Sequence, residues 1–200
     1  MGKRWLLTGA VVLLLWSGLE AATLGLMVQA GVGLPPRVLQ QLQTYAFQRC
    51  VAVTGCQVIP PYRVREAARS EGVFLGASVP QKGLERLLGR LGADYLLVLR
   101  VTRWEERWDF RAERALVLVG LGALDPTLGN LLGPVGLLVS LEREAEVTVL
   151  LRLFGKEGLL YSDVVTIHDA PIFSWFSATP LNAAEKALEI SLLKLSQMLG

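Results

Sequence analysis

Few side chains in this sequence have the types and spacing that catalysis requires. His168 and Asp169 form the one histidine–carboxylate pair, and a histidine held by a carboxylate is a common general base. Neighbouring residues of a strand point to opposite faces, so the two side chains are not expected to act together. The sequence has no Gly-x-Ser-x-Gly motif and no glycine-rich phosphate loop ending in Gly-Lys-Ser or Gly-Lys-Thr. We therefore expect neither an enzyme nor a bound cofactor.

Two cysteines, Cys50 and Cys56, are close enough in sequence to form a disulfide. In an oxidising compartment they pair if a tight turn through Val53-Thr54-Gly55 brings their Cα atoms within about 7 Å. The alternative is two small buried side chains, one at a helix end and one at a strand start. With a single histidine in the chain, the two thiolates do not complete the four ligands of a zinc site, and no metal is expected.

The amino terminus has the three parts of a secretory signal. Lys3 and Arg4 precede an apolar run, Trp5 to Trp16, and small residues follow it. The apolar run is shorter than the about 20 residues that a membrane span needs. We expect residues 1–22 to be a signal peptide or an amino-terminal anchor, followed by a single domain, 23–200. The domain is then periplasmic, or otherwise outside the cytoplasm, with or without attachment to a membrane.

The composition argues against a nucleic-acid partner. Apolar residues make up 52% of the chain and charged residues 19%, and twenty basic residues face eighteen acidic ones. The formal net charge of +2 lacks the strongly basic balance of nucleic-acid-binding domains. Six basic residues could still gather on one side of two short helices, where a solvated helix face is the default interpretation: Arg63, Arg65, Arg69, Lys82, Arg86 and Arg90.

Hydrophobic periodicity predicts alternating strands and helices, followed by an antiparallel hairpin. Alternating apolar residues predict strands at 23–32 and 144–154, and an unbroken apolar run predicts a buried strand at 95–101. A short strand is expected at 57–59, and 159–167 is expected to pair with 144–154 through a four-residue loop, 155–158. Helical spacing predicts helices at 37–51, 64–70, 80–91 and 180–199. This order, β-α-β-α-α-β-(insertion)-β-β-α, predicts an α/β (α+β) sandwich in which helices pack on a mixed sheet of about five strands.

Three local phrases resemble a group of bacterial envelope domains. They are Leu-Gly-Ala-Asp-Tyr-Leu-Leu at 91–97, Arg-Val-Thr-Arg-Trp at 100–104, and the hairpin at 153–162. The group includes the TolB amino-terminal domain, the penicillin-binding-protein activator LpoB, the curli secretion protein CsgG and small periplasmic lipoproteins of unknown function. The resemblance implies the same fold over about residues 23–199 and a role as an adaptor, activator or export component. The lipid-bearing cysteine of most of these proteins has no counterpart here.

The segment 116–141 is unusually apolar, with Asp125 as its single charged residue. It contains glycines and prolines that interrupt a continuous helix, and it lies between two expected strands. It either contacts a membrane, a partner protein or a second copy, or it folds over the domain's own sheet. The leucines that would make a membrane or oligomer contact are Leu116, Leu118, Leu121, Leu124, Leu128, Leu131, Leu132, Leu137 and Leu138.

Two aromatic clusters are candidate partner surfaces, because aromatic and arginine side chains are common interface anchors. On a strand, Trp104 and Trp108 share one face. The alternative is that one strand face and the aromatic loop are covered by the domain itself. The candidate surface residues are Trp104, Arg107, Trp108, Phe173, Trp175 and Phe176.

These features together predict an exported, non-enzymatic accessory or assembly protein of the cell envelope. It would bind another envelope component through the apolar insertion and the aromatic strand, with an envelope protein, a membrane or a homo-oligomer as partner. Two other functions stay open. One is a CsgG-like oligomeric secretion or pore subunit, and the other is a periplasmic module that binds a glycan or a small molecule.

Overall fold

The described strands form one mixed sheet of five strands in the order β2-β1-β3-β4-β5. The computed structural model describes residues 22–31, 33–76, 79–110, 116, 141–169 and 179–199. The strands are β1 (Thr23–Ala30), β2 (Gln57–Ile59), β3 (Tyr95–Phe110), β4 (Leu141–Gly155) and β5 (Gly158–Asp169). β1 runs parallel to β2 and β3, whereas β4 is antiparallel to β3 and β5. The mixed five-stranded sheet predicted from the sequence is confirmed.

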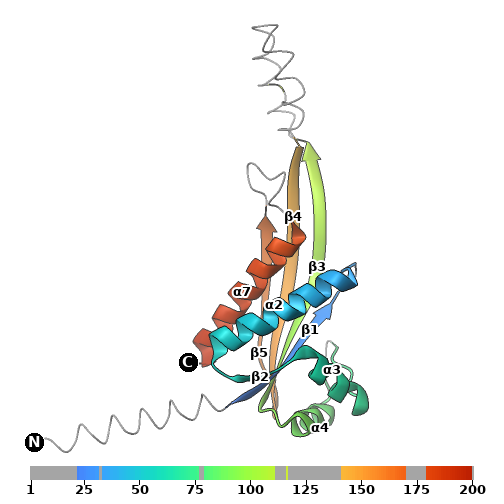
Figure 1. Ribbon diagram of the computed structural model, residues 1–200, viewed down its shortest axis with the longest axis vertical. Coiled ribbons are helices and arrows are strands. Elements are labelled where there is room, and N and C mark those ends of the chain that lie inside the picture. Colours follow the sequence, from blue (N-terminus) through green and yellow to red (C-terminus); the bar gives the residue numbers. More distant parts are fainter. Residues whose placement is uncertain are drawn as a thin grey trace, which may run out of the picture.

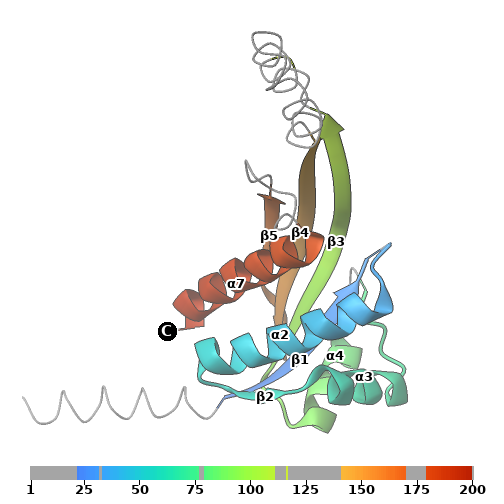
Figure 2. The ribbon, with the colours of Figure 1, turned by 45° about the horizontal axis from the view of Figure 1, so that its top comes forward.

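Helices cover both faces of this sheet (Figures 1 and 2). They are α2 (Pro36–Thr54), α3 (Pro61–Ser70), α4 (Gln81–Leu91) and α7 (Pro180–Leu199). α2 and α7 contact each other, and α7 also packs on β4 and β5. α3 packs on β1 from the other face and contacts α4. The α/β sandwich and its element order are therefore also confirmed.

Proline and glycine set the helix limits, as the sequence indicated. α2 has Pro36 in its first turn and ends at Gly55, whose φ of 65° is a left-handed conformation that glycine adopts without strain. α4 ends in the same way at Gly92, with φ 62°. The amide of Ala93 donates to the carbonyl of Leu88 at 3.0 Å, which satisfies a carbonyl of the last helical turn.

Asp94, in the phrase shared with the envelope domains, has a structural role. Its amide donates to the carbonyl of Thr23 at 2.8 Å, and its carboxylate accepts from the amide of Thr23 at 2.9 Å. Asp94 precedes β3 and Thr23 begins β1, so these two bonds align the starts of the two central strands. The resemblance in this phrase therefore reflects the fold and assigns no activity.

Two apolar cores lie on the two faces of the sheet. The larger core joins β1, β3, β4 and β5 to α2 and α7, and includes Leu97, Leu151 and Leu188. The smaller core joins β1 and β3 to α3 and α4, and includes Leu84 and Leu96. Neighbouring residues such as Leu96 and Leu97 pack into different cores, so both faces of β3 are buried there. This explains why the sequence of the central strand is a continuous apolar run.

The structure differs from the prediction at two strand ends. β3 continues to Phe110, well past the apolar run that ends at Val101, because its outer part pairs with β4 rather than with β1. The hairpin loop is shorter than expected, since Gly155 pairs with Gly158 and only residues 156 and 157 connect the strands. Two-residue loops are common in hairpins because their twist matches that of the strands.

Candidate functional site

The paired outer parts of β3 and β4 form an arm, defined here as residues 102–110 and 141–148. β1 ends where Ala30 pairs with Val101, whereas β3 continues to Phe110, which pairs with Leu141. At about 3.3 Å per residue, β3 extends roughly 30 Å beyond Val101. The arm points away from the helix-covered end of the sheet (Figure 1). The segment between its strands, residues 111–140, therefore both begins and ends at the tip of the arm.

A β-bulge sets the direction of the side chains along the arm. The register of β3 shifts between Val101 and Arg103, and the hydroxyl of Thr102 donates to the carbonyl of Thr148 at 3.3 Å. Bulges commonly re-aim the side chains that follow them. Beyond the bulge, Trp104 pairs with Val147 and is partly buried against the larger core.

The opposite face of the arm carries a network of charges. Glu105 pairs with Glu146 across the two strands, and the Arg103 guanidinium binds both carboxylates. The hydrogen bond from Arg103 lowers the pKa of Glu105 below its ordinary value and raises the pKa of Arg103. Arg107 donates to Glu105 at 2.9 Å. Like charges directly opposite each other are unfavourable in a sheet, so the arginines stabilise this arrangement.

His168 and Asp169 are directed to different faces, as expected from their places on a strand. The Nε2 atom of His168 lies 3.8 Å from Oε1 of Glu146, within the charged face. Asp169 instead accepts a hydrogen bond from Lys186 of α7 at 3.1 Å. A hollow of about 260 Å³ opens beside both His168 and Asp169, and its other lining residues are Glu105, Arg107, Glu144, Ala145 and Glu146.

The structure separates two of the candidate partner residues and leaves most of the others outside its described part. Trp104 packs toward the larger core, whereas Arg107 belongs to the charged face, so the two do not form one continuous surface. Trp108 is described only as a backbone position paired with Arg143. Leu116 is described and 70% exposed. The remaining candidates lie outside the described residues: Leu118, Leu121, Leu124, Leu128, Leu131, Leu132, Leu137, Leu138, Phe173, Trp175 and Phe176.

Cys50 and Cys56 are both free thiols in the structure. Cys50 is buried inside α2 as part of the larger core, whereas Cys56 is partly exposed just before β2. Burial raises the pKa of the Cys50 thiol to about 12, so this thiol is a poor nucleophile at neutral pH. The disulfide stays a prediction for the oxidised protein.

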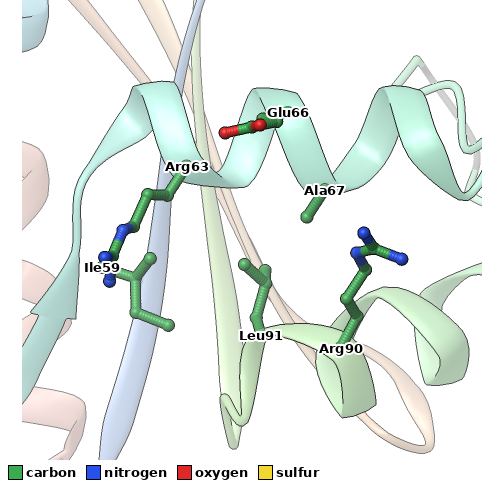
Figure 3. Close-up of a pocket in the computed structure, with 6 residues that line it drawn as sticks. All are labelled: Ile59, Arg63, Glu66, Ala67, Arg90 and Leu91. Atoms are coloured by element: carbon green, nitrogen blue, oxygen red, sulfur yellow. The ribbon is translucent and has the colours of Figure 1, made fainter.

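Four of the six basic residues of α3 and α4 line two separate hollows, whereas Lys82 and Arg86 line neither of them. Arg63 and Arg90 lie on opposite sides of a hollow of about 300 Å³ between the helices, with Leu91 in its floor (Figure 3). Arg90 binds Glu71 at 3.0 Å, so this hollow is partly neutralised.

The other two basic residues of α3, Arg65 and Arg69, lie beside Arg100 of β3 in a separate groove. In the sequence, Arg100 is distant from both and is marked only as a single arginine near the end of an apolar strand.

No protein-family description and no curated protein matches this sequence. Among solved structures, the hypothetical protein CT253 from Chlamydia trachomatis is 8% identical, with 90% of this chain and 98% of that chain covered and a TM-score of 0.55. Lipoprotein GNA1162 from Neisseria meningitidis is 15% identical, with 89% and 97% covered and a TM-score of 0.47. The LpoB C-terminal domain from Salmonella enterica is 9% identical, with 77% and 92% covered and a TM-score of 0.36.

These similarities concern the fold. The LpoB domain is among the proteins that the sequence phrases resemble, but of these three similarities only the one to CT253 is close enough to show a shared fold. Within the described ranges, none of the helices combines the length and the apolar character needed to cross a membrane.

Proposed function

We propose that this chain is an exported, non-enzymatic accessory domain of the bacterial envelope that attaches to another envelope component through the tip of its arm. The observation that carries the proposal is that the apolar segment 116–141 is inserted where Phe110 pairs with Leu141. This position is the farthest point of the arm from the body of the domain (Figure 1). The signal-like amino terminus and the fold shared with envelope domains support the same function.

The strand pairing supports a contact at the tip. The pairing of β5 with β4 ends at Ala145, which lies opposite Glu106, so beyond that point the described part of the arm has only two strands. A two-stranded ribbon is marginally stable in water by itself. An apolar contact at the tip, with a membrane, a partner protein or a second copy, would bury surface and stabilise the ribbon.

A loop replacement tests this function. Residues 112–140 are replaced by a short Asn-Gly turn that joins β3 to β4, and the full chain is expressed with its own amino terminus. The body has its own two cores, so we expect a cooperative unfolding transition like that of the unaltered protein. We also expect the variant to leave the membrane fraction or to lose its oligomeric state in gel filtration.

A matched control separates the arm from exposed apolar residues in general. Leu159 and Leu160, which are 54% and 50% exposed, lie in the β4–β5 hairpin at the other end of the sheet. Replacing both with Ser should leave membrane or oligomer association unchanged. The proposal is wrong if the loop variant unfolds, which would make the segment part of the core, or if it associates as strongly as the unaltered chain.

The size and the membrane association of the unaltered protein distinguish the possible kinds of partner. A large ring of copies in detergent would favour the oligomeric secretion or pore subunit. Association with membranes as a monomer or dimer would favour the accessory domain. The glycan-binding function would require Trp104 to be reachable by a ligand, whereas its side chain is partly buried against the larger core.

A further inference from the structure

A groove of about 470 Å³ lies on the α3 face of the sheet, where β1 ends. The groove is lined by the last residues of β1, the side of α3, the loop after α3, Arg100 of β3 and Leu39 of α2. In open α/β sheets, ligands commonly bind beyond the carboxyl ends of parallel strands, and β1 and β3 are parallel here. None of its lining residues belongs to α7 or to the arm.

Three arginines line this groove. Arg65 and Arg69 are one helical turn apart on α3, and Arg100 comes from β3. Within the described part of the chain, none of the three guanidinium groups has an ion pair or a hydrogen bond to a side chain. The lining residues include no carboxylate. On α3, Glu66 lies instead beside the hollow toward α4 (Figure 3). Three positive charges therefore meet without a protein counter-charge.

An aromatic side chain lies beside these charges. Phe74, in the loop after α3, is 85% exposed and lines the same groove. The side-chain amide of Gln29 in β1 donates to the carbonyl of Leu75 at 2.6 Å, which holds this loop against the end of β1. A Cβ atom at Gly76 would come within 2.9 Å of the Phe74 ring, so the ring lies directly against this glycine.

We infer that this groove is a binding site for a phosphate group carried on an apolar or aromatic moiety. Arginine binds phosphate through paired hydrogen bonds, and three guanidinium groups are best neutralised by an anion with more than one charge. A single carboxylate would leave most of that charge uncompensated. Phe74, Leu39 and Leu75 supply an apolar surface for the remainder of the ligand. This inference is independent of the function proposed for the arm.

The phosphate could belong to a soluble ester or to the headgroup of a phospholipid. The experiment therefore uses the full chain with two probes that both carry a phosphate monoester: phenyl phosphate in calorimetric titration, and vesicles with and without phosphatidic acid in co-sedimentation. Benzoate and inorganic phosphate are titrated in parallel. We expect phenyl phosphate to bind at least about tenfold more tightly than benzoate, because charge-assisted hydrogen bonds to phosphate are strong. Binding of vesicles but not of phenyl phosphate would assign the headgroup.

Three variants and a matched control complete the test. Arg100→Gln should lower the affinity for the probe about tenfold or more, and so should the double variant Arg65→Gln with Arg69→Gln. Arg86→Gln, an exposed arginine of α4 outside the groove, removes the same charge and should leave binding almost unchanged. Phe74→Ala should weaken the binding of phenyl phosphate but not the binding of inorganic phosphate.

The folding of the variants supplies a second readout. Because the three arginines have like charges and no described partner, Arg100→Gln should unfold at the same temperature as the unaltered protein or at a higher one. The inference is overturned if neither probe binds, if benzoate binds as tightly as phenyl phosphate, or if Arg86→Gln is as damaging as Arg100→Gln. A lower unfolding temperature for Arg100→Gln would also overturn it, since it would show a structural role.

Discussion

Glu105 of β3 and Glu146 of β4 lie directly opposite each other on the arm, and Arg103 binds both carboxylates. The hydrogen bond from Arg103 is the main reason that the pKa of Glu105 is below its ordinary value of 4.5. A carboxylate whose pKa is lowered by folding stabilises the folded state above its ordinary pKa. That contribution is lost as the pH falls through the lowered value.

Arg103→Gln should reverse this pH dependence. Without the guanidinium, the two carboxylates repel each other across the strands, so the pKa of Glu105 should rise from its lowered value. The variant should be less stable than the unaltered protein at pH 7, and the difference should shrink by pH 3. Urea unfolding at both pH values and an NMR titration of the Glu105 carboxyl measure these effects. An unshifted Glu105 titration would contradict the role given to Arg103.

Trp104 and Arg107 should differ in their effect on stability, since only Trp104 packs against the core. Trp104→Ala should lower the free energy of unfolding by about 2–4 kcal/mol, the range for removing a large, partly buried aromatic side chain. Arg107→Ala should change it by less than about 0.5 kcal/mol, as exposed substitutions usually do. Denaturant unfolding compares the two. Equal losses would show that the two side chains share one environment.

Leu192 and Leu193 in α7 provide a matched pair of neighbours. Leu192 is fully buried in the larger core, whereas Leu193 is 46% exposed. Leu192→Ala should lower the free energy of unfolding by about 2–5 kcal/mol, through lost burial and the cavity left behind. Leu193→Ala should cost much less, about 0.5 kcal/mol or below. A large loss at Leu193 in the full chain would indicate that another part of the protein covers this side of α7.

Cys50 should resist alkylation in the reduced, folded protein. With a thiol pKa of about 12, its reactive thiolate is scarce at pH 8, and the side chain is also buried. Iodoacetamide should therefore modify Cys56 well before Cys50, and denaturant should make the two equal. Mass spectrometry of peptides follows both sites. The same peptides, taken from protein exported to an oxidising compartment, show whether the predicted disulfide forms.

Periodicity and breaker residues predicted most of the fold. Gly55 and Gly92 ended helices where expected, and the three-residue strand Gln57–Ile59 was located from its flanking residues. The sequence indicated a strand around Trp104 and Trp108, but not that a single strand would run from Tyr95 to Phe110. Residues 103–110 are strongly charged, and they form a strand because each pairs with a residue of β4, more than thirty residues later in the sequence. Pairing between distant segments overrides local propensity in strands.

The candidate sites show the same division. The amino-acid sequence alone determined the apolar and charged patterns, because hydrophobic spacing and turn residues act on near neighbours. Strand alternation alone places Trp104 and Arg107, three residues apart, on opposite faces. Only the tertiary structure decided which of these faces is covered, because Trp104 packs against the larger core while Arg107 belongs to the charged network. The tertiary structure likewise brought Arg100 to the same groove as Arg65 and Arg69. These three residues line one groove only because α3 and β3 pack near each other in the fold. Packing between distant segments, unlike periodicity, does not produce a pattern in the local sequence.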